Sequence, residues 1–325
     1  MPSHDQTPQD YESILLNGAL LLGLGFMFVI SGCMSVDSQA TTSKPDAPLN
    51  PICHVEETTE GCWMPLEGTT NCHIWNESSP RTDETASFEG DSDCLGGKLT
   101  GSGTVTLSWS QRGEKLTHTK TGKYVDGMAN GQFKEVGPYG GKEEGSYANN
   151  RRHGSWISDI PGIGRSEGAF ENGMAHGTWV MTMANGSRME GPFVQNVRHG
   201  HWKISHRDGS RHEGNYKNGL RDGNWVVVLG DGTRNEGMYV SDFRNGEWFI
   251  EKPNGTTEKG NFKDGKRHGN WVILPADGSR LEGPYVNGEK HGEWLTTFTE
   301  GGSNKGPFVN GRRQGEWVIT FPGGG

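Results

Sequence analysis

The chain has 325 residues, including 52 glycines and 11 tryptophans, and its formal net charge is −9. Glycine far above its average share of about 7% argues against a compact α/β enzyme with one thick apolar core, whereas the many aromatic side chains argue against a disordered chain. Residues 1–121 are acidic and residues 122–325 are nearly neutral, so neither part has the basic excess of a nucleic-acid-binding protein.

Residues 14–33 form a long run without charged side chains near the start of the chain. The run is about long enough to cross a bilayer as a helix. It ends in Ile30-Ser31-Gly32-Cys33, which resembles a bacterial lipobox. The resemblance implies that residues 1–33 are a signal segment and that Cys33 is the site of lipidation. Residues 1–13 contain three acids and no lysine or arginine, unlike the basic start of a signal peptide, so an uncleaved signal anchor is the alternative.

The other cysteines all precede residue 95, at Cys53, Cys62, Cys72 and Cys94. An even, clustered set in an exported chain predicts two disulfides, with the connectivity left open. Zinc binding is the alternative, but the spacing contains no C-x-x-C pair. We therefore expect a small disulfide-bonded region over residues 52–95. Residues 34–51, rich in Ser, Thr, Asp and Pro, are predicted to be a flexible tether between the lipid and this region.

Tryptophan recurs every 23 residues from Trp156 to Trp317, and a glycine stands two residues before each of them. A second glycine series runs from Gly122 to Gly306 at the same interval, and each of these glycines is followed two residues later by Tyr or Phe. A fixed period of this length is the signature of a repeat protein. The pattern gives nine repeats in phase over residues 122–325, the first with Phe133 in place of tryptophan.

Each repeat contains two segments in which apolar and polar residues alternate, which predicts strands. The segments are joined by a turn such as Asn287-Gly288, a strong hairpin signal. A second turn, such as Asp231-Gly232, leads into the next repeat. We therefore predict an all-β fold, an elongated single-layer antiparallel β-meander built of 23-residue hairpin repeats.

The 23-residue unit resembles the MORN repeat, which has an aromatic residue near an opening glycine, a glycine turn, and a second strand that begins with Gly-x-Gly. This chain departs from that pattern by placing tryptophan where the second of these glycines stands. Residues 88–121 resemble a degenerate first repeat or cap, with Phe88-Glu89-Gly90 and Gly101-Ser102-Gly103. The resemblance implies a twisted single-layer sheet. It implies no single activity, because MORN arrays occur in scaffolds, in membrane-apposing proteins and as parts of enzymes.

The aromatic side chains of the repeats are predicted to lie in file on one face of the sheet. Two strands per repeat place successive tryptophans about 10 Å apart. Such a face can bind sugar rings or apolar side chains of a partner. The alternative is that these residues form the one-sided core of a sheet without a second layer. The predicted binding face comprises Trp156, Trp179, Trp202, Trp225, Trp248, Trp271, Trp294, Trp317, Tyr147, Phe170, Phe193, Tyr216, Tyr239, Phe262, Tyr285 and Phe308.

Histidines recur near the hairpin turn. A 23-residue step separates neighbouring members by about 10 Å, which is too far to share one metal ion, so we expect no metal site. No nucleotide-binding, zinc-protease or serine-hydrolase motif is present, and the acids and bases repeat with the period as structural residues do. We therefore expect a protein that is not an enzyme and has no cofactor. The histidines that recur near the hairpin turn are His153, His176, His199, His268 and His291.

Together these features predict a non-catalytic lipoprotein of the bacterial cell envelope. It would be membrane-anchored on the periplasmic or surface side, and would bind or scaffold a protein or polysaccharide through the aromatic face. A glycan- or peptidoglycan-binding module is one alternative. A cytoplasmic antitoxin-like MORN protein is another, against which the lipobox and the cysteine pattern argue.

The segment 316–321 is predicted to be the final strand, and it is apolar with one charge. Exposed edges of this kind pair with other chains unless they are protected. Either the sequence is truncated here, or the edge is a site for self-association or for a partner strand.

Overall fold

The computed structural model describes residues 52–56, 59–76, 80–81 and 83–323, and side-chain burial from residue 62 onward. The predicted signal segment, Cys33 and the tether lie outside the described residues. The described chain consists of strands and turns, so the predicted all-β antiparallel meander is confirmed. The described residues contain no helix that could span a membrane. The chain divides into two units, residues 1–142 and 143–325, and the predicted boundary after residue 121 falls inside a strand of the first.

The first unit is a meander of long strands with a smaller set of three strands joined to it. Strands β4 to β7 pair in sequence order, and β4 pairs with β5 along its whole length, so residues 52–95 do not form a separate body. Strands β1 to β3 pair antiparallel with one another. The strands are β1 (Ile52–Glu56), β2 (Thr59–Pro65), β3 (His73–Asn76), β4 (Thr85–Leu95), β5 (Lys98–Gln111), β6 (Glu114–Val125) and β7 (Met128–Val136).

Backbone hydrogen bonds tie the three small strands to the meander. Trp75 N donates to Gly127 O at 2.9 Å, and His73 N donates to Gly97 O at 3.0 Å. A disulfide joins Cys72, just before β3, to Cys94 at the end of β4. Cys62 is also disulfide-bonded, and the strand register places it opposite Cys53. Cys72–Cys94 is thus one disulfide among the four predicted cysteines, and the side chain of Cys53 lies outside the described ones.

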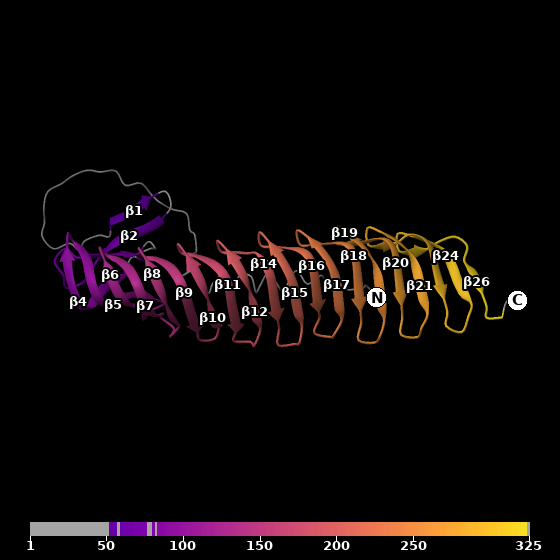
Figure 1. Cartoon of the computed structure of the whole chain (residues 1–325), viewed down its shortest axis with the longest axis horizontal. Helices are drawn as coiled ribbons and strands as arrows, with labels where there is room; N and C mark the ends of the chain where they lie inside the picture. The colour runs from indigo at the N-terminus through magenta and orange to yellow at the C-terminus, as the bar shows by residue number, and fades with distance from the viewer. Residues whose placement is uncertain (1–51, 57–58, 77–79, 82, 324–325) are drawn as a thin grey trace. The chain divides into compact units, whose positions relative to one another are not determined.

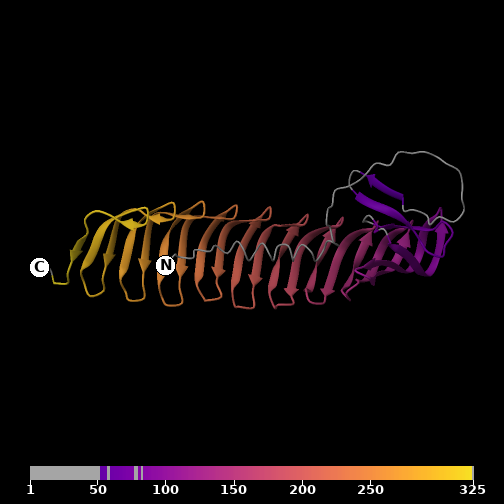
Figure 2. The ribbon, with the colours of Figure 1, turned by 180° about the vertical axis from the view of Figure 1, so that it is seen from behind.

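The second unit is a run of antiparallel hairpins in which neighbouring long strands pair, as Figures 1 and 2 show from opposite sides. The two-residue strands β13, β22 and β25 pair only with the strand before them. Its strands are β8 (Lys142–Ala148), β9 (Arg151–Ile160), β10 (Gly164–Glu171), β11 (Met174–Met183), β12 (Arg188–Val194), β13 (Val197–Arg198), β14 (Gly200–Ser205), β15 (Arg211–Lys217), β16 (Leu220–Val228), β17 (Arg234–Val240), β18 (Phe243–Glu251), β19 (Thr257–Lys263), β20 (Lys266–Leu274), β21 (Arg280–Val286), β22 (Glu289–Lys290), β23 (Gly292–Thr297), β24 (Ser303–Val309), β25 (Arg312–Arg313) and β26 (Val318–Thr320).

The two turn types have the chemistry that the sequence predicts. At the hairpin turn, Asn218 and Gly219 have φ of 52° and 83°, the left-handed pair of a type I′ turn. At the second turn, the Asp231 carboxylate accepts a hydrogen bond of 2.8 Å from Thr233 N. Hydrogen bonds from Thr233 also hold the pKa of Asp231 below its usual value.

Each second strand bends at the glycine two residues before its tryptophan. Gly223 has a φ of 93°, and the pairing of β15 with β16 shifts register between Gly214 and Tyr216. A register shift of this kind is a bulge, which bends the strand. The end of each hairpin therefore forms a short arm at an angle to the main sheet.

The predicted final strand is shorter than residues 316–321. Only Val318–Thr320 forms β26, which pairs with β24. Val318, Ile319 and Phe321 are exposed. Self-association through this segment stays a prediction.

Candidate functional site

The aromatic residues of the second unit form one continuous stack, which we call the aromatic spine. Tryptophan alternates with Tyr or Phe from Tyr147 to Trp317, always edge to face. Within a repeat, Tyr216 and Trp225 have centroids 5.1 Å apart, and the step to the next repeat, Trp225 to Tyr239, is 6.1 Å. Edge-to-face contacts are the favoured geometry of aromatic pairs, so the spine links each repeat to both neighbours.

The second glycine series makes room for these rings. A Cβ added to Gly214 would lie 2.3 Å from Cδ2 of Trp225, and the other glycines of the series from Gly145 to Gly306 face their tryptophans in the same way. The indole N–H then reaches the backbone, as when Trp225 Nε1 donates to Asn215 O at 3.0 Å. Glycine is therefore required because the indole lies flat on the strand.

The spine is buried, although the sheet has a single layer. The tryptophans from Trp156 to Trp294 are 0–7% exposed, while Phe193, Phe308 and Trp317 are half-buried. The rings that were predicted to form a binding face thus serve as the one-sided core, which was the alternative interpretation. Their flat faces are not open to a sugar ring in most repeats.

The cover over the spine comes from cationic side chains on the hairpin arms. We call the residue four before each tryptophan the cap position, and in all repeats of the second unit but one it carries a charge that lies on the rings. Arg267 lies 4.2 Å from the centroid of Trp271 and 5.4 Å from that of Tyr285. Cation–π contacts of this kind are attractive when partly desolvated. The cap positions are Arg152, Ala175, Arg198, Arg221, Arg244, Arg267, Lys290 and Arg313.

Two glutamates, Glu258 buried and Glu143 half-buried, neutralise part of this cationic row. Glu143 pairs with Arg152, and Glu258 pairs with Arg267 at 2.5 Å and with Lys252 at 2.6 Å. Burial raises the pKa of Glu258, but the hydrogen bonds and charges of Lys252 and Arg267 outweigh it and hold the pKa below its usual value. Where the row lacks a glutamate, burial lowers the pKa of Lys290, and the charges of Arg313 and Arg267 lower it further.

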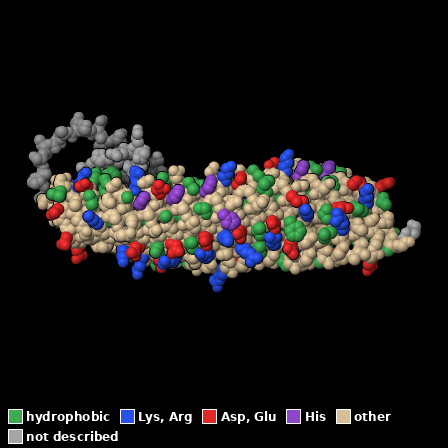
Figure 3. Space-filling model, in the orientation of Figure 1, with side chains coloured by type: hydrophobic (Ala, Val, Ile, Leu, Met, Phe, Trp, Pro, Cys, Tyr) green, Lys and Arg blue, Asp and Glu red, His purple; other side chains and the backbone are tan. Residues whose placement is uncertain are grey.

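The opposite face of the sheet carries charges that pair with each other. Arg188 and Glu190 lie 2.7 Å apart, and Arg165–Glu167, Arg234–Glu236 and Arg280–Glu282 repeat the pair. Figure 3 shows cationic and anionic side chains interspersed on the face that it displays. Exposed pairs of this kind contribute little stability, and they give the face no field of one sign.

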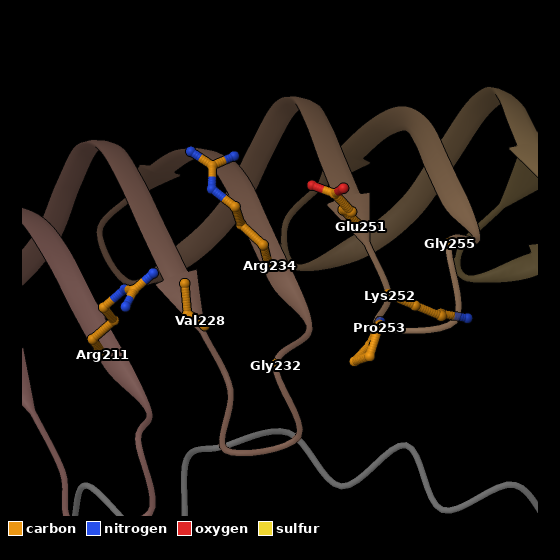
Figure 4. A pocket seen from close by; sticks show the side chains of 8 residues that line it. All are labelled: Arg211, Val228, Gly232, Arg234, Glu251, Lys252, Pro253 and Gly255. Carbon is orange, nitrogen blue, oxygen red and sulfur yellow. The ribbon is translucent and has the colours of Figure 1, made fainter.

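A shallow hollow of about 290 Å³ lies beside these paired charges, lined by residues from the four successive strands β15 to β18 and from the turns after β16 and β18. Its side chains include Arg211, Arg234 and Lys252, and Figure 4 shows that their charged ends do not converge. Arg234 and Lys252 are already paired, with Glu236 and Glu258. The hollow therefore offers little to an anion.

The recurring histidines do not meet one another in the described structure. His176 Nδ1 lies 3.7 Å from Glu171, and both side chains are exposed. Within residues 52–56, 59–76, 80–81 and 83–323, no group of three or more His, Cys, Asp or Glu side chains is placed to hold a metal ion.

A row of exposed apolar side chains, which was not predicted from the sequence, runs along the hairpin ends. Val194 pairs with Val197, and Val240 pairs with Phe243. Successive ends are joined by backbone hydrogen bonds, such as Gly219 N to Arg198 O at 2.9 Å. The 23-residue period would have located this row, had the turn positions been aligned. The tip row comprises Met174, Val194, Val197, Leu220, Val240 and Phe243, each 37–53% exposed.

Comparisons with known proteins identify no family for this chain. No family model matches the chain, and no curated protein matches it. One similar solved structure is the SAS-4 (dCPAP) TCP domain in complex with a proline-rich motif of Ana2 (dSTIL) from Drosophila melanogaster, at 15% identity and a TM-score of 0.27, covering 56% of this chain and 84% of that one. Another is a point mutant of the TCP10 domain of Danio rerio CPAP, at 13% identity and a TM-score of 0.29, covering 60% and 90%.

Proposed function

We propose that this protein is a binding or scaffolding protein of the bacterial cell envelope, held at the membrane by a lipid on Cys33. Its MORN-like array is a preformed surface for a protein partner. The tip row, and not the ring faces of the aromatic spine, is the surface that docks this partner. A glycan-binding role is less well supported, because the rings that would stack on sugars are buried.

The tip row is the observation that carries this proposal. Contiguous exposed apolar patches mark interaction sites in soluble proteins. The row follows consecutive repeats and is interrupted by Lys217, the partner of Leu220 in the strand register. It ends where Lys263 and Lys266 take the equivalent positions in the next repeat. Beyond it, the equivalent turns keep one exposed valine each, Val286 and Val309, opposite Glu289 and Arg312. The turns with exposed apolar side chains and no lysine pair therefore continue from Met174 to Phe243.

Site-specific photo-crosslinking in the intact envelope tests the row. A benzophenone side chain is introduced at Val197, Leu220 or Phe243 of the full-length protein, and at Lys263 or Lys266 as matched controls on the same turn geometry. We expect one crosslinked protein shared by the three apolar positions, and its loss in Val240→Lys. Equal crosslinking at the lysine positions, or none along the row, would refute the proposal.

The anchor is tested separately, because the lipobox-like residues lie outside the described structure. Cys33→Ser is expected to leave an unprocessed precursor or to release the protein from membranes. Unchanged size and unchanged membrane fractionation would mean that the chain is a signal-anchored or cytoplasmic protein instead.

A further inference from the structure

The row of cap positions has one missing charge. Seven of the eight cap positions in the second unit hold arginine or lysine over the spine, and the second holds Ala175. Among the described side chains, none of the cation–π contacts involves Trp179 or Phe193. The capping arginines of the two neighbouring repeats contact other rings. Arg152 lies on Trp156 and Phe170, and Arg198 lies on Trp202 and Tyr216.

The backbone at the gap is the same as in the capped repeats. Ala175 O accepts a hydrogen bond of 3.0 Å from Asn196 N, just as Arg152 O accepts one of 2.8 Å from Gly173 N. The Asn196 side chain in turn accepts one of 2.6 Å from Ala175 N. The repeat therefore has the backbone of a capped repeat and lacks the capping side chain.

The rings below the gap are more accessible than their equivalents. Trp179 is 7% exposed, against 2% for Trp156 and 0% for Trp202. Phe193 is half-buried, whereas Tyr216 in the next repeat is buried. Trp179 is thus the least covered of the tryptophans from Trp156 to Trp294, while it remains buried. Phe308 is half-buried as well, under Lys290.

A buried hydroxyl without a partner lies at the same repeat. Ser166 is 1% exposed, and its Oγ makes no hydrogen bond. By the 23-residue period, Ser166 stands where Glu143 and Glu258 accept hydrogen bonds from the capping Arg152 and Arg267. Buried polar groups without partners are uncommon, and this one occupies the acceptor position of a missing guanidinium.

We propose that the Ala175 gap, formed by Ala175, Trp179, Phe193 and Ser166, is a receptor for an arginine side chain of a partner polypeptide. The guanidinium lies on Trp179 and Phe193 and directs an N–H toward Ser166 Oγ. Arginine is the expected group because six of the seven occupied caps are arginine, whose flat guanidinium both stacks and donates hydrogen bonds. The gap is distinct from the tip row, and its test does not depend on that row.

Fluorine NMR of the full-length protein, labelled with 5-fluorotryptophan and purified in detergent, tests the receptor. The probe is N-acetylarginine methylamide, and its neutral isostere N-acetylcitrulline methylamide is the control. We expect the arginine probe to shift the Trp179 resonance, assigned with Trp179→Phe, in a saturable way, and the citrulline probe to leave it unchanged. Ala175→Arg fills the gap, so the shift at Trp179 is expected to disappear.

Arg198→Ala provides an internal standard, because it opens the same space over Trp202. In this variant Trp202 is expected to respond to the arginine probe as Trp179 does. Silence at Trp179 in the unmodified protein overturns the proposal, whether or not Trp202 responds. The proposal is also overturned if the citrulline probe shifts Trp179 as much as the arginine probe does, or if the shift persists in Ala175→Arg. It is overturned as well if Trp179 responds to tetramethylammonium but not to the arginine probe.

Discussion

The two units of the chain cover the aromatic side of a single-layer sheet in different ways. In the first unit, additional strands provide the cover. Ala129 stands at the cap position and is 1% exposed, while Gly127 O accepts the N–H of Trp75 in β3. A Cβ on Gly127 would lie 2.5 Å from Cζ3 of Trp63 in β2. The cover there is made once, by strands β2 and β3, and the disulfide of Cys72 ties them to β4.

In the second unit, each repeat covers its own part of the spine. The bent arm carries a cation onto the rings, and the indole bonds to its own hairpin. Such cover can be added repeat by repeat, so stability is expected to be nearly additive along the array. In the first unit, the alanine at the cap position, Ala129, lies where additional strands cover the rings. The Ala175 gap is the repeat where the second unit lacks both a cation and such an element.

The largest effect is expected from removing a ring at the middle of the spine. Trp225→Ala deletes a buried indole that contacts both neighbouring repeats, and such truncations cost about 3–5 kcal/mol. Trp317→Ala is expected to cost less, because Trp317 is half-buried and its Nε1 makes no hydrogen bond. Denaturant unfolding, with hydrogen exchange to locate the loss, measures both free energies. Equal costs would mean that the unit unfolds as one globular block.

The second prediction tests whether the disulfide of the first unit stabilises that unit alone. Cys72→Ala with Cys94→Ala removes the bond that closes a 22-residue separation, and loss of a disulfide costs about 2–4 kcal/mol. Hydrogen exchange is expected to rise in residues 62–136 and to stay unchanged in residues 180–297. The control is the unmodified protein under the same conditions without reductant, which keeps the bond of Cys62 intact in both proteins. An equal rise in both ranges would show that the array depends on the first unit for its stability.

The strands, both turn types and the single-layer meander could be predicted, because they follow from the alternation and from paired Asn-Gly and Asp-Gly steps. The function of the glycines before each Tyr or Phe could not, since only the structure shows an indole lying flat on Gly214. Burial of the spine was also open from sequence, because the bend at Gly223 depends on a register shift between strands. The predicted bounds of the last strand, residues 316–321, were too wide. The hydrogen-bonded pairing with the neighbouring strand, and not the apolar character of the segment, decides where β26 begins.

The capping cations were visible in the sequence as a series from Arg152 to Arg313 but carried no signal by themselves, because arginine near a hairpin turn is usually a solvated residue. Their role depends on the arm bending back over the rings. The vacancy at Ala175 is likewise defined only once the occupied positions are known. The tip row was missed because valine and leucine beside a turn read as ordinary strand ends.

The third prediction concerns the close approach of backbone and ring. Gly214→Ala places a methyl group 2.3 Å from Trp225 Cδ2, and overpacking of this kind costs about 1–3 kcal/mol. Gly137→Ala is the control, because its nearest neighbour is Gly141 O at 3.7 Å. We expect denaturant unfolding to show a loss for the first variant and near neutrality for the second. Equal effects would mean that backbone freedom, and not the ring, explains the glycine series.

The smallest effect distinguishes a buried ion pair under the caps from the exposed pairs on the opposite face. The folded pKa of Glu258 lies below its unfolded value of about 4.3. The carboxylate therefore contributes stability that is fully present above about pH 4.3 and is lost as the pH falls through the folded pKa. In Glu258→Gln this contribution is absent. We expect the difference in unfolding free energy between the two proteins to be greatest at neutral pH and to shrink in acid.

Glu236→Gln is the matched control for this comparison, because Glu236 pairs with Arg234 while about half exposed. Its effect is expected to be small at every pH, since water screens an exposed pair. Urea unfolding of the three proteins at pH 7 and at about pH 3 measures the differences. A Glu258→Gln effect that does not change with pH would mean that Lys252 and Arg267 contact an uncharged group. The caps would then be held by the rings alone, and the repeats with and without a glutamate would be equivalent.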